Sequence, residues 1–318
     1  AFSVQRTATG TRIGIHIAAP GLGFAPGSAF DAIARARLST AYMPGRKFTM
    51  LPEDVIAMFS LDHGGELPAV SLYVDVDADY AVRARHTRLE RVPIVANLRH
   101  AEYDVLNQAF ENGETRGLAF EAELNTLWRV ALGLEAHRGR PGAGSAGHDY
   151  TFYVENDRVR IVPRKRGAPL DKLVAEMMIL VNSAWGEFLS ERNVAAIYRV
   201  QSTGKVRFGV HPEPHEGLGV ACYAWMSSPL RRYVDLVNQW QLAATLAGCG
   251  GSGEPSASAA GGGGKLSLVA YSTPREVYEE LIPAFQGTPE GEGVEFEQSY
   301  AASGEQSRAV EAGLPADY

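Results

Sequence analysis

The chain has 318 residues, of which 45% are hydrophobic and 21% charged, and its formal net charge is −7. This length is enough to bury one large core or two modest ones, and the composition is that of an ordinary globular protein. The negative charge excludes nucleic-acid binding through bulk charge, although it leaves room for a local basic channel. No apolar run is long enough to span a membrane. Cys222 and Cys249 show no metal-ligand or disulfide-framework spacing, which favours a reducing compartment.

Periodicity predicts a mixture of strands and helices. The chain opens on an alternating pattern without Met or a leader, which we interpret as a start within a domain. Residues 2–5 and 12–17 read as paired strands, and Ser28 as the cap of the helix that follows. Further strands are expected at 69–76, 86–97 and 206–210, a hairpin at 150–154 and 158–163, and helices at 120–137 and 170–189. The predicted fold class is therefore mixed α+β.

The segment Ser227-Ser228-Pro229-Leu230-Arg231-Arg232-Tyr233 combines turn residues with two adjacent arginines. We expect Ser228 to cap a helix that has Pro229 in its first turn. Arg231 and Arg232 would then oppose the helix dipole and repel each other, unless an anion lies between them. A phosphate suits the planar guanidinium fork. A surface salt bridge from Arg232 to Asp235 explains the spacing equally well, and both interpretations stay open.

The same segment resembles the SPxRRYxDL signature of the RNB catalytic domain, the hydrolytic core of the ribonuclease II and ribonuclease R family. Residues 1–242 carry the resemblance, which implies a β-sheet or barrel core flanked by helices. Ala19 departs from the family pattern, which has Asp at this position. The other matching residues are His16-Ile17-Ala18, Pro26-Gly27-Ser28, Asp31, Arg37, Tyr42, Pro44-Gly45 and Met50-Leu51-Pro52.

The resemblance implies roles for individual residues. Arg231 matches the arginine that contacts the scissile RNA phosphate, and Tyr42 matches a tyrosine that stacks on a base near the RNA 3′ end. Stacking of this kind contributes about 1–3 kcal/mol per base for any sequence. The implied catalytic residue is therefore Arg231, and the implied RNA-binding residues are Tyr42, His100, Glu176, Asn182, Arg232 and Tyr233.

The implied activity is 3′→5′ hydrolysis of single-stranded RNA to nucleoside monophosphates in the cytoplasm. The family uses Mg²⁺ held by clustered aspartates, since hard cations activate water and stabilise the leaving oxygen. These aspartates form a DxDDA-type run whose final Ala matches Ala1. We therefore expect the metal ligands just before Ala1 and none in this chain. An RNA-binding remnant without hydrolysis stays open as an alternative.

The last part of the chain resembles a different protein. Residues 243–249 are similar to a bacterial lipobox that ends at Cys249, and residues 250–264 form a Gly/Ser/Ala-rich linker. Residues 265–318 resemble the truncated α/β start of a periplasmic sulfate-binding protein, in which Ser303 and Gly304 would bind the anion. We thus expect three parts, 1–242, 243–264 and 265–318, and a chimera of two coding regions. A sulfate-binding module, or an RNB domain with an unusual tail, stays open.

Overall fold

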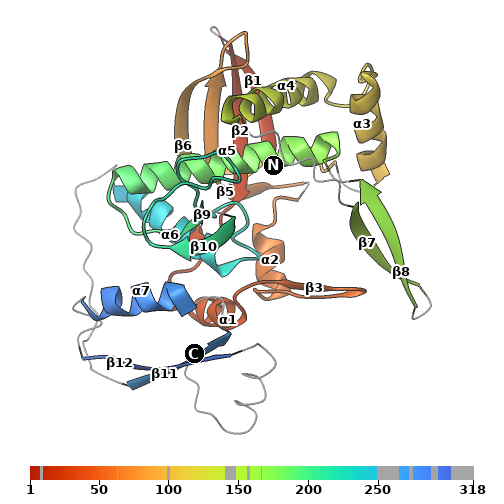
Figure 1. The fold of residues 1–318 in the computed structure, drawn as a ribbon. Helices are drawn as coiled ribbons and strands as arrows, with labels where there is room; N and C mark the ends of the chain where they lie inside the picture. Colours follow the sequence, from red (N-terminus) through yellow and green to blue (C-terminus); the bar gives the residue numbers. More distant parts are fainter. Residues whose placement is uncertain are drawn as a thin grey trace.

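In the computed structural model of the chain, the described residues are 1–7, 10–62, 64–98, 101–139, 148–155, 158–165, 167–202, 204–248, 265–271, 275–287 and 293–301. Their helices and strands lie in the mixed order that the sequence predicts (Figure 1). No helix in these ranges is both long and apolar enough to cross a bilayer.

The centre of the fold is an antiparallel sheet of four strands in the order β1-β2-β5-β6. Alternation along β2 directs Ile13, Ile15 and Ile17 into the core, where all three are buried. Within the described ranges β1 and β6 form the two edges of this sheet, so the core is an open sheet and not a closed barrel. The four strands are β1 (Phe2–Thr7), β2 (Gly10–Ala18), β5 (Glu66–Val76) and β6 (Val82–Pro93).

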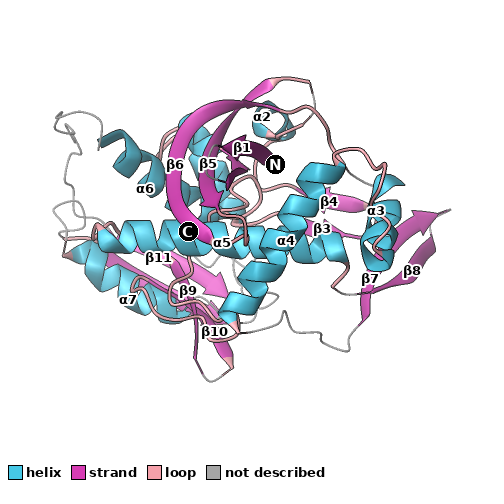
Figure 2. Cartoon of the chain, turned by 90° about the horizontal axis from the view of Figure 1, so that it is seen from above, coloured by secondary structure: helices cyan, strands magenta, loops and turns pink. Residues whose placement is uncertain are grey.

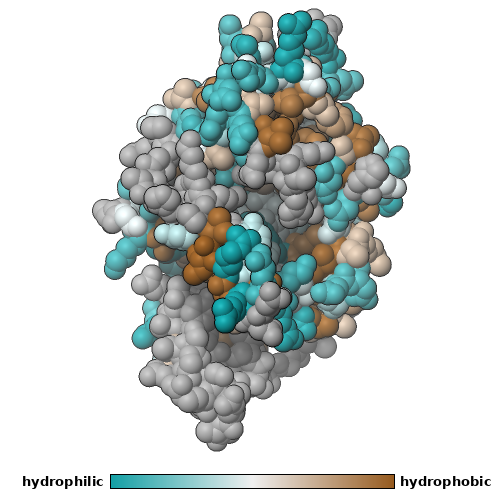
Figure 3. Space-filling view, turned by 90° about the vertical axis from the view of Figure 1, so that its right-hand side faces the viewer, coloured by the Kyte–Doolittle hydropathy of each residue, from teal (hydrophilic) through white to brown (hydrophobic). Residues whose placement is uncertain are grey.

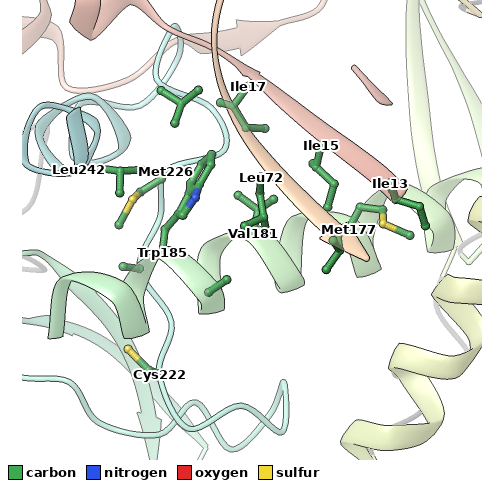
Figure 4. Close-up of a cluster of buried hydrophobic side chains, with 14 of the residues drawn as sticks. Ile13, Ile15, Ile17, Leu72, Met177, Val181, Trp185, Cys222, Met226 and Leu242 are labelled. Atoms are coloured by element: carbon green, nitrogen blue, oxygen red, sulfur yellow. The ribbon is translucent and has the colours of Figure 1, made fainter. Parts of the chain in front are cut away.

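Three helices cover the apolar face of the sheet: α4 (Glu121–Arg138), α5 (Pro169–Glu191) and α6 (Tyr233–Gly248). The long helix α5 crosses the sheet in both ribbon views (Figures 1 and 2). Its residues Met177, Val181 and Trp185 pack against the isoleucines of β2 and against Leu72 (Figure 4). The Trp185 indole also donates a hydrogen bond to Thr87 Oγ1 at 3.0 Å, so this large ring is buried without an unpaired N–H.

A second, smaller core joins α6 to two short helices, α1 (Ala29–Arg37) and α2 (Glu53–Phe59). Leu236 of α6 is fully buried against Met50 and Leu51 at its centre. The cap predicted for α1 is confirmed, because Ser28 Oγ accepts a hydrogen bond from the Asp31 N–H at 3.3 Å. This core fixes the start of α6 relative to the first sixty residues of the chain.

Among the described residues, three hairpins lie outside the central sheet. They pair β3 (Ala41–Met43) with β4 (Arg46–Phe48), β7 (His148–Glu155) with β8 (Arg158–Lys165), and β9 (Tyr198–Ser202) with β10 (Lys205–Gly209). The remaining elements before α6 are the 3-10 turn Pro20–Leu22 and α3 (Ala101–Asn112).

The C-terminal part is a small β-α-β unit. Strands β11 (Lys265–Tyr271) and β12 (Glu295–Ala301) are parallel, and α7 (Arg275–Gln286) connects them. Phe285 of α7 packs edge-on against Phe296 of β12, with ring centroids 6.1 Å apart. Helix α7 also contacts β10 of the preceding part. The structure shows α6 continuing to Gly248, so the boundary expected after Leu242 falls inside a helix.

Candidate functional site

The arginine-rich segment before α6 forms a turn. The N–H groups of Arg231 and Arg232 both bond to the carbonyl of Ser228, at 3.0 and 3.1 Å, and α6 begins only at Tyr233. The prediction that Ser228 caps a helix with both arginines in its first two turns is therefore wrong. The turn is fixed from the other side by a strand-like pairing, because Thr40 N–H bonds to the Arg231 carbonyl at 2.9 Å.

The two arginines have different surroundings. Arg232 binds the carboxylate of Asp235 with two nitrogens, each at 2.7 Å, and its guanidinium lies 4.0 Å from the centre of the Trp225 ring. The ion pair expected from spacing is confirmed, but Asp235 is fully buried, so the pair is not a surface one. Burial raises the pKa of Asp235, against the lowering effect of Arg232. The Arg231 side chain is exposed and has no hydrogen-bond or ion-pair partner among the described residues.

A pocket of about 320 Å³ opens beside this turn, and we call it the Arg231 pocket. Among its described lining residues, two side chains are cationic and none is acidic. Six lining residues carry hydroxyl groups, which donate hydrogen bonds to anions as readily as to neutral acceptors. The lining residues are Ala18, Thr40, Tyr42, Lys47, Thr49, Ile56, Ser60, Ser227, Ser228, Pro229, Leu230 and Arg231.

Tyr42 lies in this pocket with Arg231, although the two residues are 189 positions apart in the sequence, from 42 to 231. The β3–β4 hairpin carries it, and 67% of Tyr42 is exposed. A packing role for this aromatic ring would require burial, so an exposed ring at a pocket wall fits a stacking platform. Figure 3 looks onto the side where the hairpins project and shows hydrophobic side chains gathered there among hydrophilic ones.

Asn182 is 1% exposed, and its side chain is used entirely within the protein. Its Oδ1 accepts a hydrogen bond from the Met226 N–H at 2.9 Å. Its Nδ2 lies 3.1 Å from the Tyr223 hydroxyl and 3.2 Å from Ser227 Oγ. Asn182 therefore holds the segment from Tyr223 to Ser227, which leads into the Arg231 turn. These contacts leave no group of its side-chain amide free to bind RNA.

Glu176 is also buried, at 3% exposed, and it forms an ion pair with Arg138 at the end of α4. Burial raises the pKa of Glu176, while Arg138 lowers it. The Arg138 guanidinium further donates to the carbonyl of Leu218. Glu176 thus joins α5 to α4 and to the loop after β10, and it does not line the Arg231 pocket.

Tyr233, the first residue of α6, donates its hydroxyl proton to Asp31 Oδ1 at 2.6 Å. Burial raises the pKa of Tyr233, and the hydrogen bond to Asp31 raises it further. Asp31 also accepts the Gly27 N–H at 2.7 Å, so this contact ties α6 to the start of α1. The other predicted site residues, His100, Ser303 and Gly304, lie outside the described residues.

The donor set near the pocket does not fit a divalent metal. Mg²⁺ needs several oxygen ligands, mainly carboxylates, and no group of three His, Cys, Asp or Glu suited to a metal occurs in the described ranges. Asp31 is engaged by the Tyr233 hydroxyl, and Asp235 is engaged by Arg232 and the Ser228 N–H. The described residues near the pocket therefore do not form a ligand set that fits Mg²⁺.

Comparison with known proteins identifies this fold. The profile of the RNB domain family matches residues 1–208 and 202–248. The chain belongs to the RNB domain family. An uncharacterised ribonuclease of Synechocystis is 28% identical to it over 280 residues, which cover 78% of this chain and 40% of that protein. The chain thus spans less than half the length of this RNB relative.

Solved structures show the same fold. RNase R of Mycoplasma genitalium in complex with double-stranded RNA superposes with a TM-score of 0.68 at 17% identity, over 78% of this chain and 55% of that one. Yeast Ssd1, described as a pseudonuclease, has a TM-score of 0.61 at 16% identity, over 80% of this chain and 38% of that one. The RNB fold is therefore shared by proteins that differ in hydrolytic activity.

The resemblance of the C-terminal part is also confirmed. A sulfate-binding protein of Synechococcus elongatus is 41% identical over 76 residues, which cover 23% of this chain and 22% of that protein. One chain thus carries an RNB match and a short match to a solute-binding protein.

Sequence reasoning missed part of the pocket. Lys47, Thr40, Thr49 and Ser60 have no role in the motifs that carry the family resemblance. The signal that could have indicated Lys47 is local: a two-residue Pro-Gly turn places Tyr42 and Lys47 opposite each other in a hairpin.

Proposed function

We propose that this chain provides the RNA-binding and phosphate-contacting part of an RNB 3′→5′ exoribonuclease that acts on single-stranded RNA in the cytoplasm. The observation that carries the proposal is the Arg231 pocket. Its described lining joins an exposed aromatic ring at Tyr42 to the guanidinium of Arg231, with hydroxyl groups and no carboxylate among the described side chains. A base that stacks on Tyr42 would bring its phosphate toward Arg231, whose fork can bind two phosphate oxygens.

In this proposal the chain's own residues bind and orient the RNA. Arg231 stabilises the negative charge on the scissile phosphate, and Tyr42 holds the base. Asn182 and Asp235 position the turn that carries Arg231. The Mg²⁺ that the family uses would activate the attacking water, and its aspartate ligands would precede Ala1.

The pairing of β1 supports this location for the ligands. Ala1 and His16 exchange two backbone hydrogen bonds, both at 2.8 Å. Ala18 follows His16 by two residues on β2, and it lines the pocket. A segment joined to the nitrogen of Ala1 would therefore begin close to the Arg231 pocket, within a few residues of chain length.

The decisive experiment uses a full-length protein that includes the residues upstream of Ala1. Incubation with uniformly labelled single-stranded RNA and Mg²⁺ should release labelled nucleoside monophosphates, and EDTA should stop the release. Activity that persists in EDTA would contradict the metal-dependent proposal. RNA binding without any product would instead favour the second candidate, an RNA-binding protein without hydrolysis, a function that the likeness to the pseudonuclease Ssd1 makes worth testing.

We further propose that the chain joins two coding regions, with an RNB part followed by a linker and a solute-binding part. The support is the pair of unrelated matches along one chain. The C-terminal match covers 22% of the sulfate-binding relative, so most of that protein has no counterpart here.

A further inference from the structure

The Arg231 pocket has a second cationic residue, Lys47, on the β3–β4 hairpin. In the β3–β4 hairpin Tyr42 pairs with Lys47, and Met43 pairs with Arg46. Side chains of paired residues lie on the same face of a hairpin, and adjacent residues lie on opposite faces. Tyr42 and Lys47 thus share the face that lines the pocket, and neither Met43 nor Arg46 lines it.

The hairpin turn fixes this arrangement. Pro44 and Gly45 connect the strands, and Gly45 has a φ of +73°, which favours glycine at this position. A shift of register by one residue would exchange the faces and replace Lys47 by Arg46 at the pocket. The sequence of the turn therefore decides which cation faces Arg231.

No acidic side chain in the described ranges lies within ion-pair distance of either cation. Neither Lys47 nor Arg231 forms an ion pair there, whereas Arg46 lies over the Phe48 ring at 4.4 Å. The whole chain has a net charge of −7, whereas the described lining of this pocket carries two positive charges. Such a pocket attracts anions, because a concave site concentrates the potential of the charges that line it.

We propose that Lys47 is a second phosphate-binding residue of this pocket. It contacts a backbone phosphate next to the one that Arg231 contacts, while Tyr42 stacks on the base between them. This inference rests on the proposed RNA-binding function. Because a lysine is a point charge without a fixed fork, Lys47 adds affinity for any sequence and does not add specificity for a base.

The expected signature is electrostatic. A single phosphate contact contributes a slope of about 0.7 to the dependence of log K on log salt for single strands. Loss of Lys47 should weaken binding several-fold at low salt and reduce this slope by about 0.7, for oligoadenylate and oligouridylate alike. The difference between variant and wild type should fade at high salt.

The experiment measures fluorescence anisotropy of a fluorescein-labelled ten-nucleotide RNA against the full-length protein, over a series of KCl concentrations. The variants are Lys47→Ala, Lys47→Arg, Arg46→Ala and Arg231→Ala. Arg46 is the matched control, because it is an adjacent exposed cation on the opposite face of the hairpin. We expect Lys47→Ala to lower the affinity and the slope, Lys47→Arg to restore both, and Arg46→Ala to leave them unchanged.

Two results would overturn the assignment of Lys47 while the proposed function stands. One is unchanged binding by Lys47→Ala in a protein whose affinity Arg231→Ala does lower. The other is an equal loss for Arg46→Ala and Lys47→Ala, which would mean a diffuse basic surface. Failure of the wild type to bind RNA would contradict the proposed function itself.

If the wild type does not bind RNA, a second experiment tests whether the Arg231 pocket still binds an anion. Acetylation of lysines is followed by mass spectrometry with and without pyrophosphate. Protection of Lys47, but not of the exposed Lys205 on β10, would retain the pocket as an anion site. Equal acetylation of both lysines would overturn the anion site as well.

Discussion

Asn182 Oδ1 lies 2.9 Å from the backbone nitrogen of Met226, and this contact joins the middle of α5 to the chain that enters the Arg231 turn. On the other side of the turn, Asp235 Oδ1 accepts the Ser228 N–H at 2.7 Å. One side chain from α5 and one from α6 thus hold the two ends of the segment that carries the proposed catalytic arginine. Both supports are buried, so they act without contact with solvent.

The first prediction concerns Asn182. Its replacement by Ala removes three side-chain hydrogen bonds, and the unfolding free energy should fall by about 3 kcal/mol. Hydrogen exchange of the Met226 and Ser228 amides should accelerate more than exchange in the central sheet. The control is Asn107→Ala, because Asn107 is also buried but binds the Leu170 N–H at the start of α5. RNA affinity that falls equally in both variants would contradict a positioning role.

The second prediction concerns the buried ion pair. Asp235→Ala leaves Arg232 without its carboxylate partner and should destabilise the protein by about 3–5 kcal/mol. Denaturant unfolding measures the change. A replacement of both residues, Asp235→Leu with Arg232→Met, should cost less than Asp235→Ala alone, because no uncompensated charge remains. A double variant that is less stable than the single one would show that the ion pair itself stabilises the fold.

The third prediction concerns Arg231. If it stabilises charge on the scissile phosphate, Arg231→Ala in the full-length protein should lower turnover about 10²- to 10³-fold and RNA affinity far less. Arg231→Lys should recover little activity, because one ammonium cannot replace the planar fork. Single-turnover kinetics separates the two effects. Equal losses in turnover and affinity would mean that Arg231 only positions the strand.

The fourth prediction concerns acid stability. His16 is 5% exposed, and its two ring nitrogens lie 2.8 Å from Ser71 Oγ and 2.9 Å from Ser3 Oγ. Burial lowers the pKa of His16 to about 4. The unfolded chain therefore binds this proton more readily, and stability should fall as the pH drops from about 6.5 to about 4, by on the order of 3 kcal/mol.

The variant His16→Asn lacks this titration. Its unfolding free energy should vary less between pH 6.5 and pH 4 than that of the wild type, although the variant is less stable at neutral pH. Urea unfolding at a series of pH values gives both curves. Parallel curves would show that His16 does not carry the acid sensitivity.

The fifth prediction concerns the C-terminal part. Gly/Ser/Ala-rich composition predicts that limited proteolysis first cuts within residues 250–264. Calorimetric titration with sulfate should show no heat of binding. A solute-binding protein closes two lobes around its ligand, and the match covers only 22% of the sulfate-binding relative. Micromolar sulfate affinity, or a protected linker, would contradict this prediction.

Sequence patterns predicted most of the central elements because periodicity reports burial. The alternation of Ile13, Ile15 and Ile17 placed β2 correctly, and the apolar stripe through Met177, Val181 and Trp185 placed α5. The start of α6 was misplaced because a Ser-Pro pair is equally suited to a tight turn, and only the contacts of Ser228 with Asp235 and of Arg231 with Thr40 decide between the two.

The site could be predicted only where a motif identified it. Arg231 and Tyr42 meet in one pocket as their motifs imply. Asn182 and Glu176 lie on the expected helix, but no periodicity reveals that their polar groups are consumed by Met226 and Arg138. These contacts depend on partners about 40 residues away in the chain, beyond the reach of local sequence patterns.

The tip of the β3–β4 hairpin touches a second hairpin. A Cβ atom on Gly45 would lie 2.8 Å from a methyl group of Val154 on β7, so the glycine allows the two hairpins to meet closely. The hairpin that carries Tyr42 and Lys47 is thus in contact with Val154 at its turn. Position 154 is not part of the proposed RNA contacts. A bulkier residue there would displace the turn at Gly45 and shift Tyr42 and Lys47 together. Surface mutations on β7 are therefore expected to alter the proposed RNA binding while the pocket keeps every residue of its lining.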